Sequence, residues 1–325
     1  MTNNIKPDKP FKTLDEQIQI LKDRKLIIED NKFAKHALLT FSYYDLINGY
    51  KECFMINDEF RPNISIEYLY QFTLFDHNIQ NLIFPYTIDI ETRFKTALAY
   101  VISKKYGVFQ DEYLSKNNYI RGSKRQSDVN KILNDIKKTY NKKDIKFIDE
   151  PTRHYFLNKN HIPPWILFKN ISFNNAINLY SILQPADKRE VCNMILNIDI
   201  DTEQKIQLFK NCLSIIRKFR NKIAHNLKFI TYKTPKIILS KKVLKNTQYK
   251  ILFDKKTYNK VYSLIIAINI MLNDMYTIFD FNNSLIEIFN FYNEYNKDIV
   301  IDYCKITEIP LDIEDKLSNY LKNIS

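Results

Sequence analysis

The stretch that decides the fold is residues 201–231, DTEQKIQLFKNCLSIIRKFRNKIAHNLKFIT. It opens on Asp201, Thr202 and Glu203, which together form a helix-start signal. Apolar residues then recur at spacings of mostly three and four, the pattern of an amphipathic helix. They are Ile206, Phe209, Leu213, Ile216, Ile223 and Leu227. The sequence therefore predicts one long helix with a buried face, around which the rest of the chain is organised.

Arg220 stands where this apolar series calls for a hydrophobic residue. A guanidinium is rarely buried without a partner, so either Arg220 pairs with an internal group or the face opens there into a cleft. Residues four apart share a helix face, which places Arg217, Asn221 and His225 on the adjoining strip. A permanent cation, an amide and a histidine around one spot suit a phosphodiester, because the histidine can move a proton near neutral pH.

Composition narrows the class of protein. Three glycines in 325 residues disfavour β-rich folds and glycine-rich nucleotide loops, which need glycine at turns and phosphate cradles. The formal net charge of +12 favours an anionic partner, either a nucleic acid or an anionic membrane, and we interpret it as nucleic acid. The four cysteines are far apart, the N-terminus lacks a signal-peptide core, and no apolar run reaches a membrane span. We expect a cytoplasmic protein with no membrane contact.

The helix signals predict an all-α protein of several helices, with one small β-hairpin or an irregular arm at 228–256. A capping box at Thr13 and Glu16 opens the first helix, and Pro85 is expected to separate a helix at 65–85 from one that ends near Gly107. The predicted regions are an N-terminal helical region (1–85), a central helical region (86–200) with a basic insertion at about 108–160, a region that carries the RNKIAH motif (201–300) and a tail helix (301–325).

Two basic clusters are candidates for RNA contact, since lysine and arginine release counterions when they meet a polyanion. A solvated, flexible insertion explains the first cluster equally well. Tyr119 and Tyr140 are candidates for stacking on bases. The candidate RNA-binding residues are Lys124, Arg125, Lys137, Lys138, Lys142, Lys143, Lys228, Lys233, Lys241 and Lys242.

Common catalytic templates are absent, and no Cys/His cluster has metal-ligand spacing, so we expect neither a metal nor another cofactor. The stretch FRNKIAHN (219–226) resembles the Arg-polar-x3-His signature of HEPN ribonucleases. Three further stretches resemble the bacterial abortive-infection family (Abi-like, of the AbiD and AbiF type). They are 9–54, IETRFKTALAYVISKKYG (90–107) and IPPWILFKNISFNNAINLYSIL (162–183). The resemblance covers roughly 9–230, and it departs from the family's Glu-x-x-Arg spacing at Glu91 and Arg93.

The resemblance implies a HEPN-like helical bundle with a helical N-terminal extension, a role in anti-phage defence, and RNA as the substrate of a metal-independent endoribonuclease toxin. It also implies a homodimer with one Arg–His set from each subunit, and a neutralising partner such as a small RNA. Carried over, Arg220 stabilises the transition state, His225 is the general acid or base, and Asn221 orients the phosphate or the histidine. Arg217, Glu91 and Arg93 would support them.

Two other hypotheses remain beside the nuclease. In the first, the protein is a HEPN-type module that binds RNA, or acts through an RNA or protein partner, without cutting. In the second, it is a helical scaffold in which Arg220 merely pairs with Glu91 or another core acid.

Overall fold

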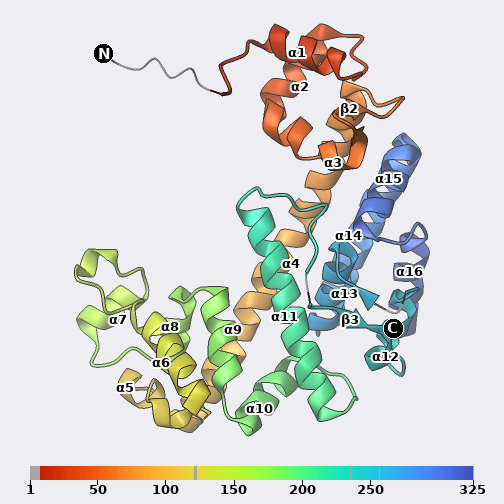
Figure 1. Ribbon diagram of the computed structural model, residues 1–325. Helices are drawn as coiled ribbons and strands as arrows, with labels where there is room; N and C mark the ends of the chain where they lie inside the picture. Colours follow the sequence, from red (N-terminus) through yellow and green to blue (C-terminus); the bar gives the residue numbers. More distant parts are fainter. Residues whose placement is uncertain (1–7, 121–122, 235, 256, 325) are drawn as a thin grey trace, which may run out of the picture. The chain divides into compact units, whose positions relative to one another are not determined.

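The computed structural model describes residues 8–120, 123–234, 236–255 and 257–324 (Figure 1). Within these ranges the chain is largely helical, and its strands form only two antiparallel pairs of two residues each. The prediction of an all-α protein is therefore confirmed. The chain divides into two compact units, the first formed by Met1–Gln80 and Ile288–Ile306 and the second by Asn81–Glu287 and Thr307–Ser325.

The first unit begins with a helix whose start was predicted. Thr13 accepts the N–H of Glu16 and the Glu16 carboxylate accepts the N–H of Thr13, so the capping box is confirmed. Asp30 caps the next helix through the N–H of Lys32. The elements are α1 (Leu14–Asp23), α2 (Asn31–Tyr43), the π-helical η1 (Tyr44–Asn48), α3 (Lys51–Phe54), β1 (Met55–Ile56), β2 (Glu59–Phe60), the start of α4 and parts of α14 (Met275–Tyr295) and α15 (Lys297–Thr307).

The predicted break at Pro85 is wrong, because α4 (Ile66–Tyr106) continues through it as one helix of 41 residues. A proline inside a helix costs about 3 kcal/mol, since it removes a hydrogen bond and crowds the preceding turn. Pro85 itself is exposed, whereas Ile83 and Ile90 on either side are buried. Burial of such side chains contributes about 1.5–3 kcal/mol each, which offsets the cost. The predicted end is confirmed, with Gly107 in the left-handed region at φ 84°.

The second unit contains the other helices and strands. They are the remainder of α4, α5 (Gln110–Tyr113), η2 (Lys116–Asn118), α6 (Ser123–Lys137), η3 (Ile145–Phe147), α7 (Thr152–Asn158), α8 (Pro164–Asn170), α9 (Phe173–Ile182), α10 (Pro185–Ile195), α11 (Thr202–Ala224), β3 (Leu239–Ser240), α12 (Lys241–Leu244), η4 (Gln248–Leu252), β4 (Thr257–Tyr258), α13 (Val261–Met271), the start of α14 and α16 (Ile313–Ile324).

The predicted central helix is α11, and it packs against α9, α10 and α13 (Figure 1). Phe209 of α11 meets the rings of Phe94 and Tyr180 at centroid distances of 5.9 and 5.3 Å. On its other side α13 is buried at every residue. Leu227 departs from the predicted buried face and is 52% exposed, because the helix ends before it at Ala224.

Residues 165–183 form two helices, because Ser172 starts α9 by accepting the N–H of Asn175. Of the two alternatives for 228–256, its described residues agree with the irregular arm, since β3 pairs with β4, which lies beyond the segment. Tyr119 is fully buried and its hydroxyl donates to the carbonyl of Tyr113, so it cannot stack on a base.

The basic insertion is folded onto the second unit. Helix α6 packs against α9 and buries Val129, Leu133 and Ile136. Lys131 and Lys137 are therefore carried by a helix with a buried face, whereas Lys138, Lys142 and Lys143 follow the end of that helix.

Candidate active site

The end of α11 fixes the positions of the predicted catalytic residues. Asp201 caps the start of the helix by accepting the N–H groups of Glu203 and Gln204, each at 3.1 Å. At the other end, the N–H of His225 reaches the carbonyl of Asn221 at 3.2 Å, and Asn226 turns the chain in the left-handed region at φ 47°. Arg220 therefore lies in the last turns, and His225 is the residue that ends the helix.

His225 is exposed and follows the last helical residue, so the predicted strip of Arg217, Asn221 and His225 is helical only as far as Asn221. Beyond the turn the chain folds back over α11. Phe229 and Tyr232 pack on Phe219, with ring centroids 5.6 and 5.2 Å apart. The histidine thus lies on an exposed corner between a buried helix and a buried return segment.

Arg220 is held by two partners but not saturated by them. One terminal nitrogen lies 3.6 Å from Oε2 of Glu91, and the other donates to Oδ1 of Asn221 at 3.3 Å. Charge-assisted hydrogen bonds usually measure about 2.7–2.9 Å, so the contact with Glu91 is long. The Nε–H of Arg220 is buried and has no hydrogen-bond partner within the described ranges. The guanidinium therefore keeps donors for a further anionic ligand.

Glu91 is only 8% exposed and its two oxygens differ. Oε1 lies 2.7 Å from Nζ of Lys95, which also donates to the carbonyl of Ile171 at 2.7 Å. Oε2 has no hydrogen-bond partner in the part of the chain that the structure describes. Lys95 is thus the nearer counterion, and Arg220 is the more distant one.

A cavity of about 370 Å³ lies beside this cluster, and we call it the α4–α8–α11 cavity. It is lined by three cationic side chains and one carboxylate, together with hydroxyl and apolar groups. Its residues are Ile88, Glu91, Thr92, Lys95, Thr96, Ala99, Trp165, Phe168, Lys169 and Arg220. Both alternatives for Arg220 therefore hold together, because it has an internal acid and also opens onto a cavity.

The other predicted site residues do not line this cavity. Arg93 donates to the carbonyl of Ile195 at 3.3 Å, and burial lowers its pKa although Asp274 opposes that shift. Burial likewise lowers the pKa of Arg217, opposed by Tyr232. Asn221 reaches the site only through Arg220. Of the predicted set, the cavity brings together Arg220 and Glu91.

Sequence reasoning missed three residues of the cavity. Lys95, Trp165 and Lys169 were not proposed as site residues, although their spacing in the sequence gives a signal. Lys95 lies four residues after Glu91, and Lys169 lies four residues after Trp165, so each pair shares a helix face. The contact between these faces and α11 is tertiary and has no local signal.

The candidate RNA-binding residues lie on separate elements. Helices α6 and α12 lie on opposite sides of α11 (Figure 1), so the two basic clusters do not merge. Lys138 pairs with Asp135 at 2.7 Å, and Lys142 donates to the carbonyl of Phe147. The side chains of Lys124 and Arg125 lie outside the described residues. The exposed candidates are Lys138, Lys143, Lys228, Lys233 and Lys242, and the half-buried ones are Lys137, Lys142 and Lys241.

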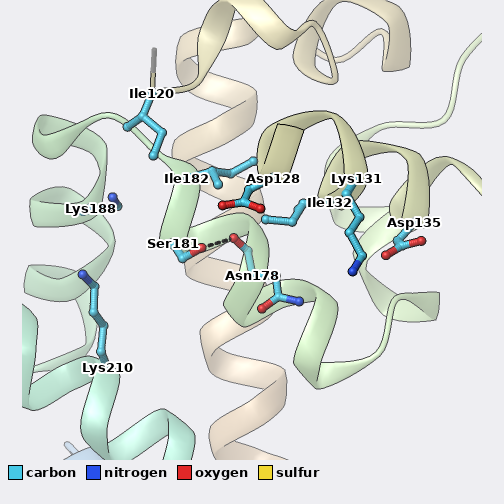
Figure 2. Close-up of a pocket in the computed structure, with 10 residues that line it drawn as sticks. All are labelled: Ile120, Asp128, Lys131, Ile132, Asp135, Asn178, Ser181, Ile182, Lys188 and Lys210. Carbon is cyan, nitrogen blue, oxygen red and sulfur yellow. Dashed lines mark hydrogen bonds between the residues drawn. The ribbon is translucent and has the colours of Figure 1, made fainter. Parts of the chain in front are cut away.

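A second hollow, of about 500 Å³, lies between α6, α9 and α10, and we call it the α6–α9 hollow. Figure 2 shows Lys188 and Lys210 on one side of it and Asp128, Lys131 and Asp135 of α6 on the other. Its cations and carboxylates nearly balance, and none of the described residues that line it is aromatic.

The fold and the cavity define an all-α protein with an internal cationic site. The family model of the Abi-like protein matches residues 36–231, which is more than half of the 325 residues, and the chain belongs to this family. That family associates the chain with abortive infection. The matched range contains α8, α11 and all of α4, and therefore every residue that lines the cavity. No curated protein and no solved structure matches the chain.

No helix among the described residues is both long and apolar enough to cross a membrane. In the same ranges, no group of three or more His, Cys, Asp or Glu side chains is arranged so that it could hold a metal ion.

Proposed function

We propose that this Abi-like protein is an endoribonuclease of the HEPN type and acts as the toxin of an anti-phage system. The observation that carries the proposal is the state of Arg220, which lines a cationic cavity with its Nε–H unused and its acidic neighbour 3.6 Å away. A guanidinium held in this way is pre-organised for the charge that develops on a phosphate during transfer.

The proposed reaction is an intramolecular phosphodiester transfer. The 2′-oxygen of one ribose attacks the adjacent phosphorus, the bond from phosphorus to the 5′-oxygen breaks, and a 2′,3′-cyclic phosphate and a 5′-hydroxyl result. His225 takes the proton of the 2′-hydroxyl or gives one to the leaving oxygen, which contributes about 10²–10⁴-fold. Arg220 offsets the charge of the pentacoordinate phosphorus, and Asn221 orients the guanidinium through its hydrogen bond.

The exposed position of His225 supports a site that two subunits share. His225 does not line the cavity of its own subunit, and it lies on an exposed corner where a second copy can approach. We therefore propose a homodimer whose Arg220 and His225 sets meet at the interface. Light scattering over a range of protein concentrations tests this, with a dimer mass expected and a monomer at every concentration contradicting it.

Cleavage of an end-labelled RNA tests the nuclease proposal. We expect Arg220→Ala and His225→Ala each to slow cleavage by about 10²-fold or more. Arg189→Ala and His154→Ala are matched controls, because both side chains are exposed and lie away from the cavity. Activity that survives in EDTA agrees with the proposal. If Arg220→Ala and His225→Ala both cleave as fast as the wild type, the assignment of these two residues to the catalytic site is overturned.

A second candidate function is RNA binding without cleavage. The observation that favours it is the absence of His225 from the residues that line the cavity. Under this alternative, wild-type protein binds RNA and yields no product at any enzyme concentration. Under the scaffold alternative it neither binds nor cleaves.

The basic residues of α6 and of the segment after α11 are proposed to contact RNA, either the substrate or a small neutralising RNA. Purification with and without added RNase tests this, since nucleic acid that RNase removes should accompany the protein.

A further inference from the structure

We propose that the α4–α8–α11 cavity is a subsite for one purine nucleotide, which it holds by stacking on Trp165 and by a hydrogen bond to Glu91. The inference deepens the proposed function and rests on it only in taking RNA as the source of that nucleotide.

Trp165 supplies a surface for stacking. It is the only tryptophan in the chain, and it is 49% exposed although it lines a cavity of about 370 Å³. Pro163 and Pro164 fix the start of α8, so the indole is carried on a rigid helix end. A half-exposed indole beside cationic groups is the arrangement that binds single bases, and a purine offers a larger face than a pyrimidine.

Glu91 supplies the polar contact. The residue is more than nine-tenths buried, lines the cavity, and has one oxygen without a hydrogen-bond partner in the described part of the chain. Arg220 lies 3.6 Å from this oxygen, too far for a hydrogen bond, and a buried acceptor without a hydrogen bond is costly, so a ligand that brings an N–H is favoured. Guanine presents two N–H groups side by side on one edge, and adenine presents its amino group. We therefore expect guanine to bind more tightly than adenine.

The ammonium of Lys95 completes the polar edge. It has three N–H donors, of which one meets Glu91 and one meets the carbonyl of Ile171. The third can reach the O6 of guanine while Glu91 accepts the neighbouring N–H. A donor on Lys95 and an acceptor on Glu91, carried one turn apart on α4, thus match adjacent groups of one base.

Two further cations can take the phosphate. Lys169 is exposed, lies one helical turn beyond Trp165, and lines the same cavity. Arg220 lines it from α11 with its Nε–H unused. With Lys95, three cations face the single carboxylate of Glu91, so the lining has a formal charge of 3 − 1 = +2. This balance suits a ligand with one phosphate.

Because Trp165 is the only tryptophan, its fluorescence reports on the cavity directly. We would titrate the full chain with GMP, AMP, CMP and UMP, and with a 2′-deoxy oligonucleotide that contains guanine and cannot be cleaved. Saturable quenching is expected, tightest for GMP, then AMP. Glu91→Gln should weaken GMP binding about tenfold and remove the preference for GMP. Lys169→Gln, an exposed change that spares the fold, should weaken all four nucleotides alike.

Lys322→Gln is the matched control, because this exposed lysine lies on α16 and does not line the cavity, and the variant should bind GMP as the wild type does. An oligonucleotide that binds at least tenfold more tightly than GMP identifies RNA as the source, and equal affinities identify a free nucleotide. The proposal is overturned if none of the probes quenches Trp165, or if UMP and CMP bind as tightly as GMP. Nucleotide binding without RNA cleavage supports this subsite and contradicts the nuclease proposal. RNA cleavage without quenching of Trp165 supports the nuclease proposal and contradicts the subsite.

Discussion

The α6–α9 hollow and the α4–α8–α11 cavity of the second unit are both lined by lysines, yet they differ in construction. The α6–α9 hollow has three lysines and two aspartates, and the described residues of its lining include neither an aromatic ring nor a fully buried charge. The α4–α8–α11 cavity has a buried carboxylate of which one oxygen accepts no hydrogen bond from the described residues, an arginine with one unused N–H donor, and a half-exposed indole. Charge alone therefore does not distinguish a site from a surface. Buried polar groups that lack partners do, because each is costly unless a ligand satisfies it.

The largest expected effect is on stability, and it should differ between a substitution in the cavity and one in the α6–α9 hollow. Glu91→Ala would leave Lys95 nearly buried without its counterion, since the lysine side chain is 13% exposed. Removing one partner of such a pair costs about 3 kcal/mol or more. Asp135→Ala in the α6–α9 hollow breaks only an exposed pair with Lys138 and should leave stability unchanged. Urea unfolding measures the free energy of unfolding of the two variants. Equal losses of stability would contradict the proposed difference between the cavity and the hollow.

A second buried carboxylate, in the first unit, extends the contrast to a group that hydroxyl and amide donors hold. Asp76 accepts hydrogen bonds from Tyr50, Tyr303 and Gln80, and burial raises its pKa to about 6 from 3.8. Because the folded pKa is the higher one, the folded state favours the protonated form. The stabilisation is complete below about pH 3.8 and is lost as pH rises to about 6.

The expected loss is up to about 3 kcal/mol across this range. The measurement is the difference in unfolding free energy between wild type and Asp76→Asn, taken from pH 4 to pH 7. This difference should move against the wild type as pH rises, and a difference that is constant with pH would show that Asp76 is ionised throughout.

Loss of the Trp165 indole should reduce RNA affinity by an intermediate amount, and a matched change in the α6–α9 hollow should not. Trp165→Ala is expected to weaken binding of a single-stranded RNA by about 1–2 kcal/mol, the usual contribution of one stacked base. Fluorescence anisotropy with a labelled oligonucleotide measures it. Ile132→Ala, a change of an apolar residue in the lining of the α6–α9 hollow, is the control and should leave the affinity as it was. Equal losses in the two variants would argue against stacking.

The smallest effect is expected for the lysines of the α6–α9 hollow. Lys131→Gln should reduce RNA affinity less than about threefold and lower the salt dependence of binding by at most one counterion. Binding constants at several salt concentrations give this slope. A loss of RNA affinity as large as that of Trp165→Ala would show that the hollow in Figure 2 contributes to RNA binding as much as the cavity does.

Sequence patterns predicted what depends on local forces. The capping box at Thr13, the cap at Asp201 and the end of α4 at Gly107 each rest on a few neighbouring residues. The break expected at Pro85 failed because buried residues on both sides outweigh a local rule. His225 left the predicted strip because Asn226 turns the chain.

The sequence predicted part of the site, namely Arg220 and Glu91. Arg220 was visible because it interrupts an apolar series, and Glu91 was proposed as its acid, a pairing that the 3.6 Å contact matches. Trp165 and Lys169 were not visible, since no local pattern predicts that α8 packs beside α4 and α11. The cavity itself is a product of tertiary packing.

Mapping the cleavage of one mixed-sequence RNA at nucleotide resolution tests the central claim most directly. We predict that the wild type cuts next to purines, that Arg220→Ala cuts at the same positions about a hundredth as fast or slower, and that Glu91→Gln still cuts but without base preference. A variant Arg220→Ala that cuts at the wild-type rate would contradict the account.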